Sequence, residues 1–554
     1  MNSANRRNLS FTYASVFALI ICLILGGCLT GQRPSAYYGK VVVPRAQEFR
    51  WSDGGLPRTF DPAFAAAPPD TDAVRALFEG LTDYDPKTLE PVPAVAQRWE
   101  SSPDGRIWTF YLREDAKWTN GEAVTASDFV RSWERTLRIG PLAPHTELFS
   151  NIEGSGVSSK PTALSATPPG FGVQALSDHV LRVRLQEPDS SFPALVAHPV
   201  FRPVKLAVTV APHTHPIEPG ELVSNGAFQL STTDNEHVLL ERANTYWDEA
   251  SVTLQKVSFV SSSSAEDALA AYQSGDIDAV TNAAFEPLAL KLLAGYQDFR
   301  RSTFGALTYY SFNNNHAPFD DVRVREALAL AIDRERVSRD DLGGATEPAG
   351  KFLPEVMSGE KPVVSKTELL EQDVKRARDL LAEAGFSNGE GFPLVRLLIN
   401  RNDQQRAVAQ SIAAMWRNVL NIQTELVIKN WDEYEVAARS GDYDVIRRGV
   451  VMQTTGELTN LKMLFERDPQ PVVAEPVATP GKSPEATKTE ELARRTLQFS
   501  SEEEALKELR AMPIYFASSF ALVKPYVSGF DSNVLDAPSL KKTRIDTNWI
   551  ERKP

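Results

Sequence analysis

Apolar and polar residues alternate along the middle of the chain in a way that predicts short strands and amphipathic helices. Residues 256–260 and 277–280 are strand-like, and the segment 265–274 between them has helical spacing and ends at a Gly275-Asp276 turn. A strand, a helix and a second strand in this order form a βαβ unit.

A second series of the same kind follows in the C-terminal half. The pattern predicts strands at 395–399, 422–428 and 444–446 and helices at 404–420 and 431–440. A further helix is predicted at 375–384, with Gly385 directly after its end. Repeated βαβ units indicate an α/β protein with mixed or parallel sheets flanked by helices.

The N-terminal third contains a different pair of signals. A strand is predicted at 108–112, directly after the turn residues Asp104 and Gly105. Thr125 and Asp128 then have the spacing of a capping box at the start of an amphipathic helix. These elements do not continue the βαβ pattern, so this part of the chain is expected to form a separate unit.

The first 28 residues have the pattern of a targeting segment. Arg6 and Arg7 precede a mostly apolar run at 11–25, which is short for a membrane-spanning helix and typical of a signal peptide. The run ends at Gly27-Cys28 and resembles a bacterial lipobox, in which Cys28 receives the lipid. An uncleaved N-terminal anchor is the alternative, and both readings place the body of the protein outside the cytoplasm.

Length, charge and cysteine content restrict the class of protein. A chain of 554 residues is too long for one core and predicts two or three lobes. The net charge of −13 argues against nucleic acid as a partner, since nucleic acid requires clustered basic residues. The two cysteines are Cys22 and Cys28, so the mature body has none available for a disulfide, a catalytic thiolate or a cysteine-ligated metal.

No sequence motif of an enzyme or a cofactor site is convincing. Gly481-Lys482-Ser483 lacks the upstream glycine of a phosphate-binding loop. His213 and His215 are interpreted as part of a solvated loop, and helix capping explains the Asp320-Asp321 pair more simply than acid–base catalysis. We therefore expect no catalytic activity, no cofactor and no metal, although carboxylates far apart in the sequence stay open as a catalytic alternative.

Residues 466–490 differ from the rest of the chain. Five prolines lie among Glu, Lys, Thr and Ala in this stretch, and large apolar residues are scarce. Such a composition predicts a mobile loop that folding does not require.

Several blocks of sequence, in a consistent order, resemble one family. They include Phe78-Glu79-Gly80-Leu81-Thr82 and the longer block at 104–122. The remaining blocks lie at 125–129, 224–228, 246–247, 274–278, 322–328, 331–334, 380–386 and 524–530. Together they resemble the bacterial extracellular solute-binding proteins of the oligopeptide, dipeptide and nickel group.

The resemblance implies a periplasmic-binding-protein-like fold with two lobes, a hinge and an extra domain inserted in lobe one. The expected segments are the signal peptide 1–27, the tether 28–40, lobe one at 41–75, 205–298 and 512–554, the inserted domain 76–204, and lobe two at 299–511.

The resemblance also implies ligand-binding residues. Arg447 and Gly449 match the segment that binds peptides in the family, whereas Val450 stands at the position of a tryptophan and Gln453 at that of an aspartate which takes the peptide α-ammonium. Tyr309, Tyr515 and the loop with Ala66 and Pro68 are expected to line the same cleft, with core packing as the alternative for both tyrosines.

The function implied by this family is solute capture for import. We expect a monomeric, lipid-anchored substrate-binding subunit that binds an oligopeptide or a related solute between its lobes and delivers it to an ABC permease. Sensing, adhesion or chaperone-like binding on the same scaffold stays open as an alternative, because the ligand segment departs from the family pattern at Val450 and Gln453.

Overall fold

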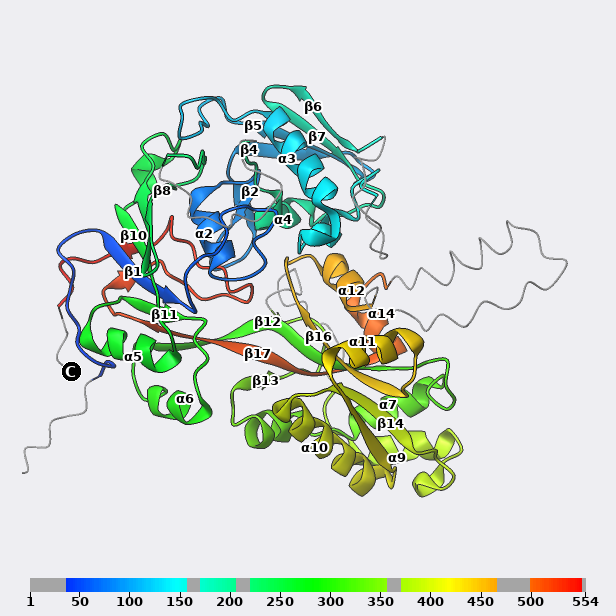
Figure 1. Ribbon diagram of the computed structural model, residues 1–554. Helices are drawn as coiled ribbons and strands as arrows, with labels where there is room; N and C mark the ends of the chain where they lie inside the picture. Colours follow the sequence, from blue (N-terminus) through cyan, green and yellow to red (C-terminus); the bar gives the residue numbers. More distant parts are fainter. Residues whose placement is uncertain (1–35, 157–169, 206–219, 356–369, 466–498, 551–554) are drawn as a thin grey trace, which may run out of the picture.

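The computed structural model describes residues 36–156, 170–205, 220–355, 370–465 and 499–550. Two lobes lie one above the other, and one mixed sheet of eleven strands passes through both of them (Figure 1). The strand order is β15-β14-β16-β12-β17-β11-β1-β10-β9-β8, and β13 pairs with β17 beside this path. The predicted two-lobed α/β fold is confirmed.

The lobe-one half of the sheet is built around its first strand. β10 and β11 lie on either side of β1, and both run parallel to it. The helix between them, α5 (Ala265–Ser274), ends at Gly275 in the left-handed conformation, as the turn signal predicted. The strands of this half are β1 (Glu48–Asp53), β8 (Phe228–Thr233), β9 (His237–Arg242), β10 (Lys256–Val260) and β11 (Ala279–Thr281). The predicted βαβ unit is therefore present, with β1 inserted between its two strands.

The lobe-two half repeats this arrangement. β14 (Val395–Asn400) lies between β15 (Thr424–Lys429) and β16 (Val445–Val451), and all three strands are parallel. Helices surround this half of the sheet (Figure 1); they are α7 (Val322–Leu330), α8 (Arg334–Arg336), α9 (Val374–Glu383), α10 (Asp403–Leu420) and α11 (Trp431–Ser440). Trp416 of α10 is completely buried, and its indole N–H donates to the carbonyl of Leu328 in α7 at 2.9 Å.

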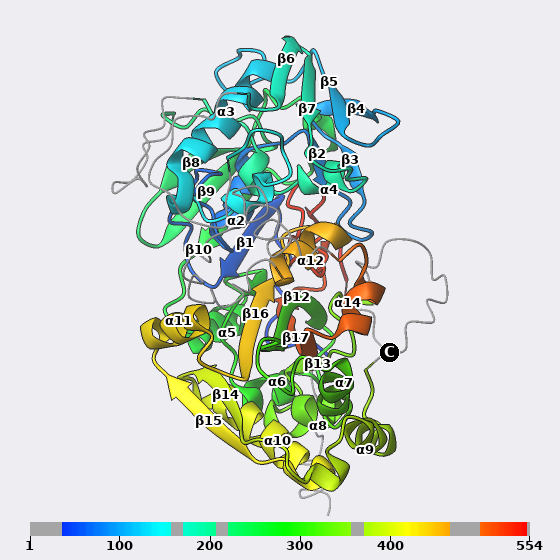
Figure 2. The ribbon, with the colours of Figure 1, turned by 90° about the vertical axis from the view of Figure 1, so that its right-hand side faces the viewer.

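Residues between β1 and β8 form a unit with small sheets of its own at the top of the molecule (Figure 2). One sheet has the order β4-β5-β7-β6, and another pairs β2 with β3. The elements are α2 (Asp70–Leu77), β2 (Thr82–Tyr84), β3 (Pro91–Pro93), β4 (Ala96–Ser101), β5 (Ile107–Leu112), α3 (Ala126–Ile139), β6 (Val173–Ser177), β7 (Val180–Arg184) and α4 (Phe192–Leu195). The capping box predicted at Thr125 and Asp128 starts α3. The boundaries of this inserted unit and of the lobes along the chain stay a prediction.

Two long strands join the lobes. β12 (Phe299–Phe312) and β17 (Ala511–Val523) are antiparallel along nearly their whole length. Their register is irregular between Thr303 and Leu307, where three residues of β12 face a single residue of β17. In β17 the side chains of residues 517–520 are only half-buried, whereas those on both sides are buried. Pairing is thus firm in each lobe and looser between them, which is the property that a hinge requires.

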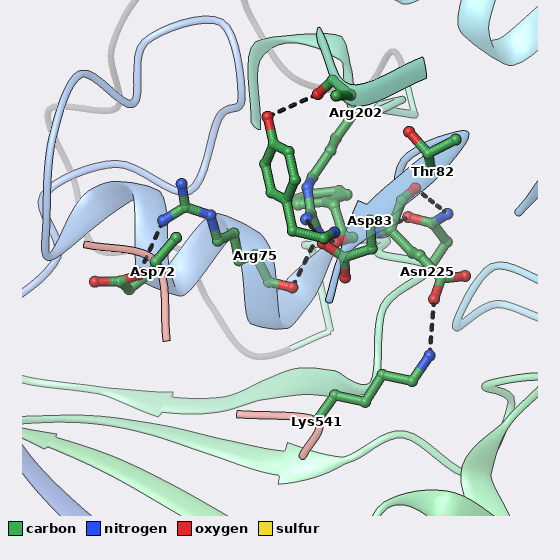
Figure 3. Close-up of polar contacts among 12 residues, drawn as sticks. Asp72, Arg75, Thr82, Asp83, Arg202, Asn225 and Lys541 are labelled. Carbon is green, nitrogen blue, oxygen red and sulfur yellow. Dashed lines mark hydrogen bonds and ion pairs between the residues drawn. The ribbon is translucent and has the colours of Figure 1, made fainter. Parts of the chain in front are cut away.

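A buried charged network fixes the inserted unit to lobe one. Glu79 accepts hydrogen bonds from the hydroxyl of Tyr246 and from the indole N–H of Trp247, and Lys541 lies 3.4 Å from the same carboxylate. Arg202, also buried, donates to the carbonyl of Phe78 and lies 3.3 Å from Asp83, as Figure 3 shows in part. Residues from three distant parts of the chain therefore meet at one carboxylate.

Removing this carboxylate charge should destabilise the protein. Glu79 is 4% exposed, and breaking a buried ion pair leaves its partner uncompensated. We expect Glu79→Gln to lower the free energy of unfolding by roughly 3 kcal/mol, measured by urea denaturation. Glu153→Gln is the control, because Glu153 pairs with Arg184 at the surface and should cost less than about 1 kcal/mol. Equal losses in the two variants would contradict the role of the network.

Candidate functional site

Arg447 and Gly449 lie on the same face of β16. Arg447 is opposite Tyr310 of β12, and Gly449 is opposite Thr308, so these four residues share one side of the sheet. Arg447 Nη2 donates to Thr308 Oγ1 at 3.3 Å. The same nitrogen lies 3.3 Å from the point that a side-chain Cβ at position 449 would occupy. Glycine therefore leaves the guanidinium room beside an exposed stretch of backbone.

Tyr515 and Gln405 complete this polar face. Tyr515 is opposite Thr308 in the register of β17 with β12, and its hydroxyl accepts from Gln405 Nε2 at 3.0 Å. The Tyr310 hydroxyl, Gln405 Oε1 and Arg447 Nε are buried and have no hydrogen-bond partner among the described residues. Burial, followed by the neighbouring Tyr515, raises the pKa of Tyr310, so its hydroxyl keeps its proton. A polar ligand would satisfy these groups, which are costly to leave unpaired. We call Thr308, Tyr310, Gln405, Arg447 and Tyr515 the polar face.

Tyr309 and Val450 lie on the other side of the sheet. The Tyr309 hydroxyl donates to the carbonyl of Leu464 in α12 (Glu457–Phe465) at 3.0 Å, and the side chain is 3% exposed. Val450 is 4% exposed. The structure thus does not bring these two predicted ligand residues to the polar face, and it places Tyr309 in core packing.

Gln453 connects the two lobes. It follows β16, and its Oε1 lies 3.1 Å from Nε2 of His198 in the inserted unit. His198 Nδ1 accepts from the backbone N–H of Val200 at 3.2 Å, so in the neutral ring Nε2 carries the proton and donates to Gln453. Burial, and then the adjacent His145, holds the pKa of His198 well below its usual range. The interlobe contact is therefore a neutral hydrogen bond.

The loop with Ala66 and Pro68 reaches the same place. His145 Nε2 donates to the Ala66 carbonyl at 3.0 Å, and the rings of His145 and His198 lie edge to face at 4.9 Å. Asp61 and Arg135, both buried, form an ion pair that ties the loop to α3. Ala66 is exposed and Pro68 is half-buried, so part of this loop is accessible beside the Gln453 contact.

Sequence reasoning missed Tyr310, Gln405, His145 and His198. Strand alternation could have suggested Tyr310, because successive side chains point to opposite sides of a sheet. Tyr310 therefore lies on the same side as Thr308, whereas Tyr309 lies on the other. The histidines carried no local signal, because His198 and Gln453 are 255 residues apart. His213, His215, residues 466–490 and Cys28 lie outside the described residues.

Two buried carboxyls, Asp53 and Asp72, influence each other's pKa. Asp53 Oδ1 accepts from Thr281 Oγ1 and Asn282 Nδ2, whereas the Oδ2 atoms of both carboxyls have no hydrogen-bond partner among the described residues. Burial raises the pKa of Asp53 to about 6, and burial together with Asp53 raises that of Asp72. Arg75 pairs with Asp72 at 3.1 Å.

Metal chemistry and membrane crossing find no support in the described part of the chain. Those residues contain no cluster of three or more His, Cys, Asp or Glu side chains suited to a metal ion. Of the helices formed by them, none combines the length and the apolar character needed to cross a bilayer.

Residues 90–470 match the model of the bacterial extracellular solute-binding proteins, family 5 Middle. The periplasmic murein peptide-binding protein MppA of Escherichia coli is 33% identical over 490 residues, which is 86% of this chain and 89% of MppA.

Solved structures indicate which arrangement of the lobes is described. The unliganded open form of MppA has a TM-score of 0.74 at 30% identity and covers 91% of this chain and 98% of its own. The Haemophilus influenzae OppA complex with the peptide RPPGFSPFR has a TM-score of 0.60 at 27% identity, with 91% and 100% covered. The lobes of this chain are thus arranged more like those of the open form.

The acid pair should make stability depend on pH. Because the pKa of Asp53 is raised to about 6, its contribution is full below the unfolded value of 3.8 and is lost as pH rises through 6. In Asp53→Asn the amide can donate to Asp72 at any pH. We expect this variant to be about 1–3 kcal/mol more stable than the parent at pH 7.5, with a smaller difference at pH 4.5, in thermal unfolding. The exposed Asp432→Asn is the control, and a difference independent of pH would contradict the raised pKa of Asp53.

Proposed function

The chain belongs to the bacterial extracellular solute-binding proteins of family 5, and from that premise we propose that it captures a peptide or related solute between its lobes and delivers it to an ABC permease. The observation that carries the proposal is the polar face, where the Tyr310 hydroxyl, Gln405 Oε1 and Arg447 Nε have no hydrogen-bond partner in the described part of the chain and lie near the exposed Gly449. Relatives in this family are binding proteins, so we infer binding without catalysis.

Backbone and side chains would share the recognition. The exposed backbone at Gly449 offers hydrogen bonds to an extended peptide, as strand addition does elsewhere. The Arg447 guanidinium supplies the cation on this face, and the ring of Tyr515 supplies an aromatic contact.

Ala66 and Pro68 would approach the ligand from lobe one when the lobes close. Val450 and Tyr309 would support this surface from behind.

Gln453 would bias recognition away from free α-ammonium groups. A buried ammonium needs a charged or well-bonded partner, and the Gln453 oxygen is neutral and already accepts from His198. The buried Asp53 already accepts from Thr281 and Asn282, and Asp72 pairs with Arg75. Ligands with uncharged ends therefore suit this surface best.

Restoring the charge at position 453 tests this specificity. In Gln453→Asp, His198 could still donate to one carboxylate oxygen while the other takes an ammonium. We expect the parent to bind N-acetylated peptides at least as well as free ones, and the variant to shift the affinity ratio towards free N-termini about tenfold, or about 1.4 kcal/mol. Calorimetric titration of matched peptides measures the ratio, with the exposed Gln423→Asp as control. A parent that strongly prefers free N-termini would refute the role of Gln453, while failure of both peptide series would refute peptide capture.

The same proposal includes a membrane anchor. We infer that residues 1–27 are removed and that Cys28 receives a lipid, which holds a monomeric binding protein on a bacterial membrane, facing the periplasm or the cell exterior. The support is the Gly27-Cys28 junction after an apolar run.

Substitution of one cysteine tests the anchor. We expect Cys28→Ala to abolish labelling by a radioactive fatty acid and to release the protein from the membrane fraction. Cys22→Ala, which lies in the same segment, is the matched control and should label normally. Equal labelling of the Cys28 variant would exclude this cysteine as the lipid site.

A further inference from the structure

A groove far from the polar face lies where β12 leaves lobe one. It encloses about 870 Å³ and is lined by the first residues of β12, by the turn around Asp85 and by the segment with β18 (Val527–Ser528) and β19 (Arg544–Ile545). None of the proposed ligand residues lines it. The volume suits a small molecule or a headgroup rather than a single ion.

The groove is basic although the chain has a net charge of −13. Its lining includes five basic and two acidic side chains, namely Lys87, Arg300, Arg301, Lys542, Arg544, Asp85 and Asp531. Asp85 accepts from the backbone N–H groups of Lys87 and Thr88 at 2.9 Å and interacts electrostatically with Lys542, and Asp531 interacts electrostatically with Arg300. The acids thus leave most of the positive charge of the lining unbalanced.

Three of the cations are available to a ligand. Arg301 is held by Glu347 at 2.6 Å and by the Thr346 carbonyl at 3.1 Å. Lys87, Lys542 and Arg544 are exposed, and among the described residues no carboxylate lies within ion-pair distance of them. Arg544 Nε is oriented by Ser528 Oγ at 3.0 Å.

Hydroxyl groups add neutral donors to these charges. Ser302 Oγ is buried and has no hydrogen-bond partner among the described residues, and Ser528 and Ser532 also line the groove. Several cations together with hydroxyl donors match the anionic, acceptor-only oxygens of a phosphate group. We propose that this groove binds the phosphate group of a phosphorylated ligand.

Two sources of such a phosphate fit the position of the groove. The described chain begins beside it, since Gln297 N donates to the Ala36 carbonyl at 2.9 Å and Arg300 follows three residues later. Seven residues lie between Cys28 and Ala36, so the two positions are eight residue steps and at most about 28 Å apart along an extended chain. A lipid on Cys28 would therefore keep the groove near phospholipid headgroups, whereas a dissolved phosphate ester could enter it without any anchor. Phosphate binding itself does not depend on the proposed transport function.

The experiment separates these sources. In the first arm, inorganic pyrophosphate is titrated calorimetrically into the full chain in neutral detergent. In the second, the full chain is inserted into phosphatidylcholine vesicles with or without phosphatidylglycerol, and hydrogen exchange is measured at residues 527–544. The test variant is Lys87→Ala/Lys542→Ala/Arg544→Ala. The control Lys291→Ala/Lys375→Ala/Arg439→Ala removes the same charge from exposed positions elsewhere.

In the first arm, we expect pyrophosphate to bind at least tenfold more weakly to the test variant than to the parent and the control. In the second arm, we expect vesicles with phosphatidylglycerol to slow hydrogen exchange at residues 527–544 in the parent and the control but not in the test variant. Either effect supports the proposal. Pyrophosphate binding without vesicle protection identifies a free phosphate ester, and vesicle protection without pyrophosphate binding identifies the lipid headgroup. Absence of both effects, or equal effects in the test and control variants, overturns the proposal. Unchanged circular dichroism of the test variant shows that the lost binding is not lost folding.

Discussion

The antiparallel pairing of β12 with β17 is the interaction on which the rest of the structure depends. These strands belong to both halves of the eleven-stranded sheet, and each half builds outward from them. Regular pairing at their ends fixes the strands within each lobe, while the irregular register around Thr303–Leu307 concentrates deformation in the middle. A second irregularity follows between Thr308 and Tyr309, at the first residue of the polar face. A change in the twist of the two strands therefore acts directly at the edge of this surface.

Buried charges decide which parts move together. Glu79 and Arg202 bind the inserted unit to lobe one, and the Asp61–Arg135 pair binds the Ala66 loop to α3. Breaking such a pair is costly, because loss of one partner leaves a buried charge that the protein interior cannot solvate. Their arrangement makes the inserted unit, the loop and His198 follow lobe one. The hydrogen bond from His198 to Gln453 is consequently a contact between two bodies that can change their orientation.

Local signals in the sequence predicted most of the fold. The Gly275 turn, the capping box at Thr125 and the periodicity of α10 each depend on neighbours along the chain, and each is found where expected. The ligand-binding residues stay a prediction. Tyr309 was expected to line the cleft, but one step along a strand reverses the side, so that Tyr310 rather than Tyr309 lies opposite Arg447. The link between His198 and Gln453, and the burial of Asp53 beside Asp72, arise from residues brought together only by the tertiary fold.

The position of α12 has a mechanical consequence. This helix touches lobe two through Tyr309 and Phe499, and the inserted unit through the Lys462–Glu187 ion pair at 2.7 Å; Figure 2 shows it at the end of β16. The lobes therefore cannot separate along this flank unless either the Lys462–Glu187 pair or the contacts of α12 with lobe two break. The partly exposed ion pair is the weaker of these junctions, because water solvates its charges once they part.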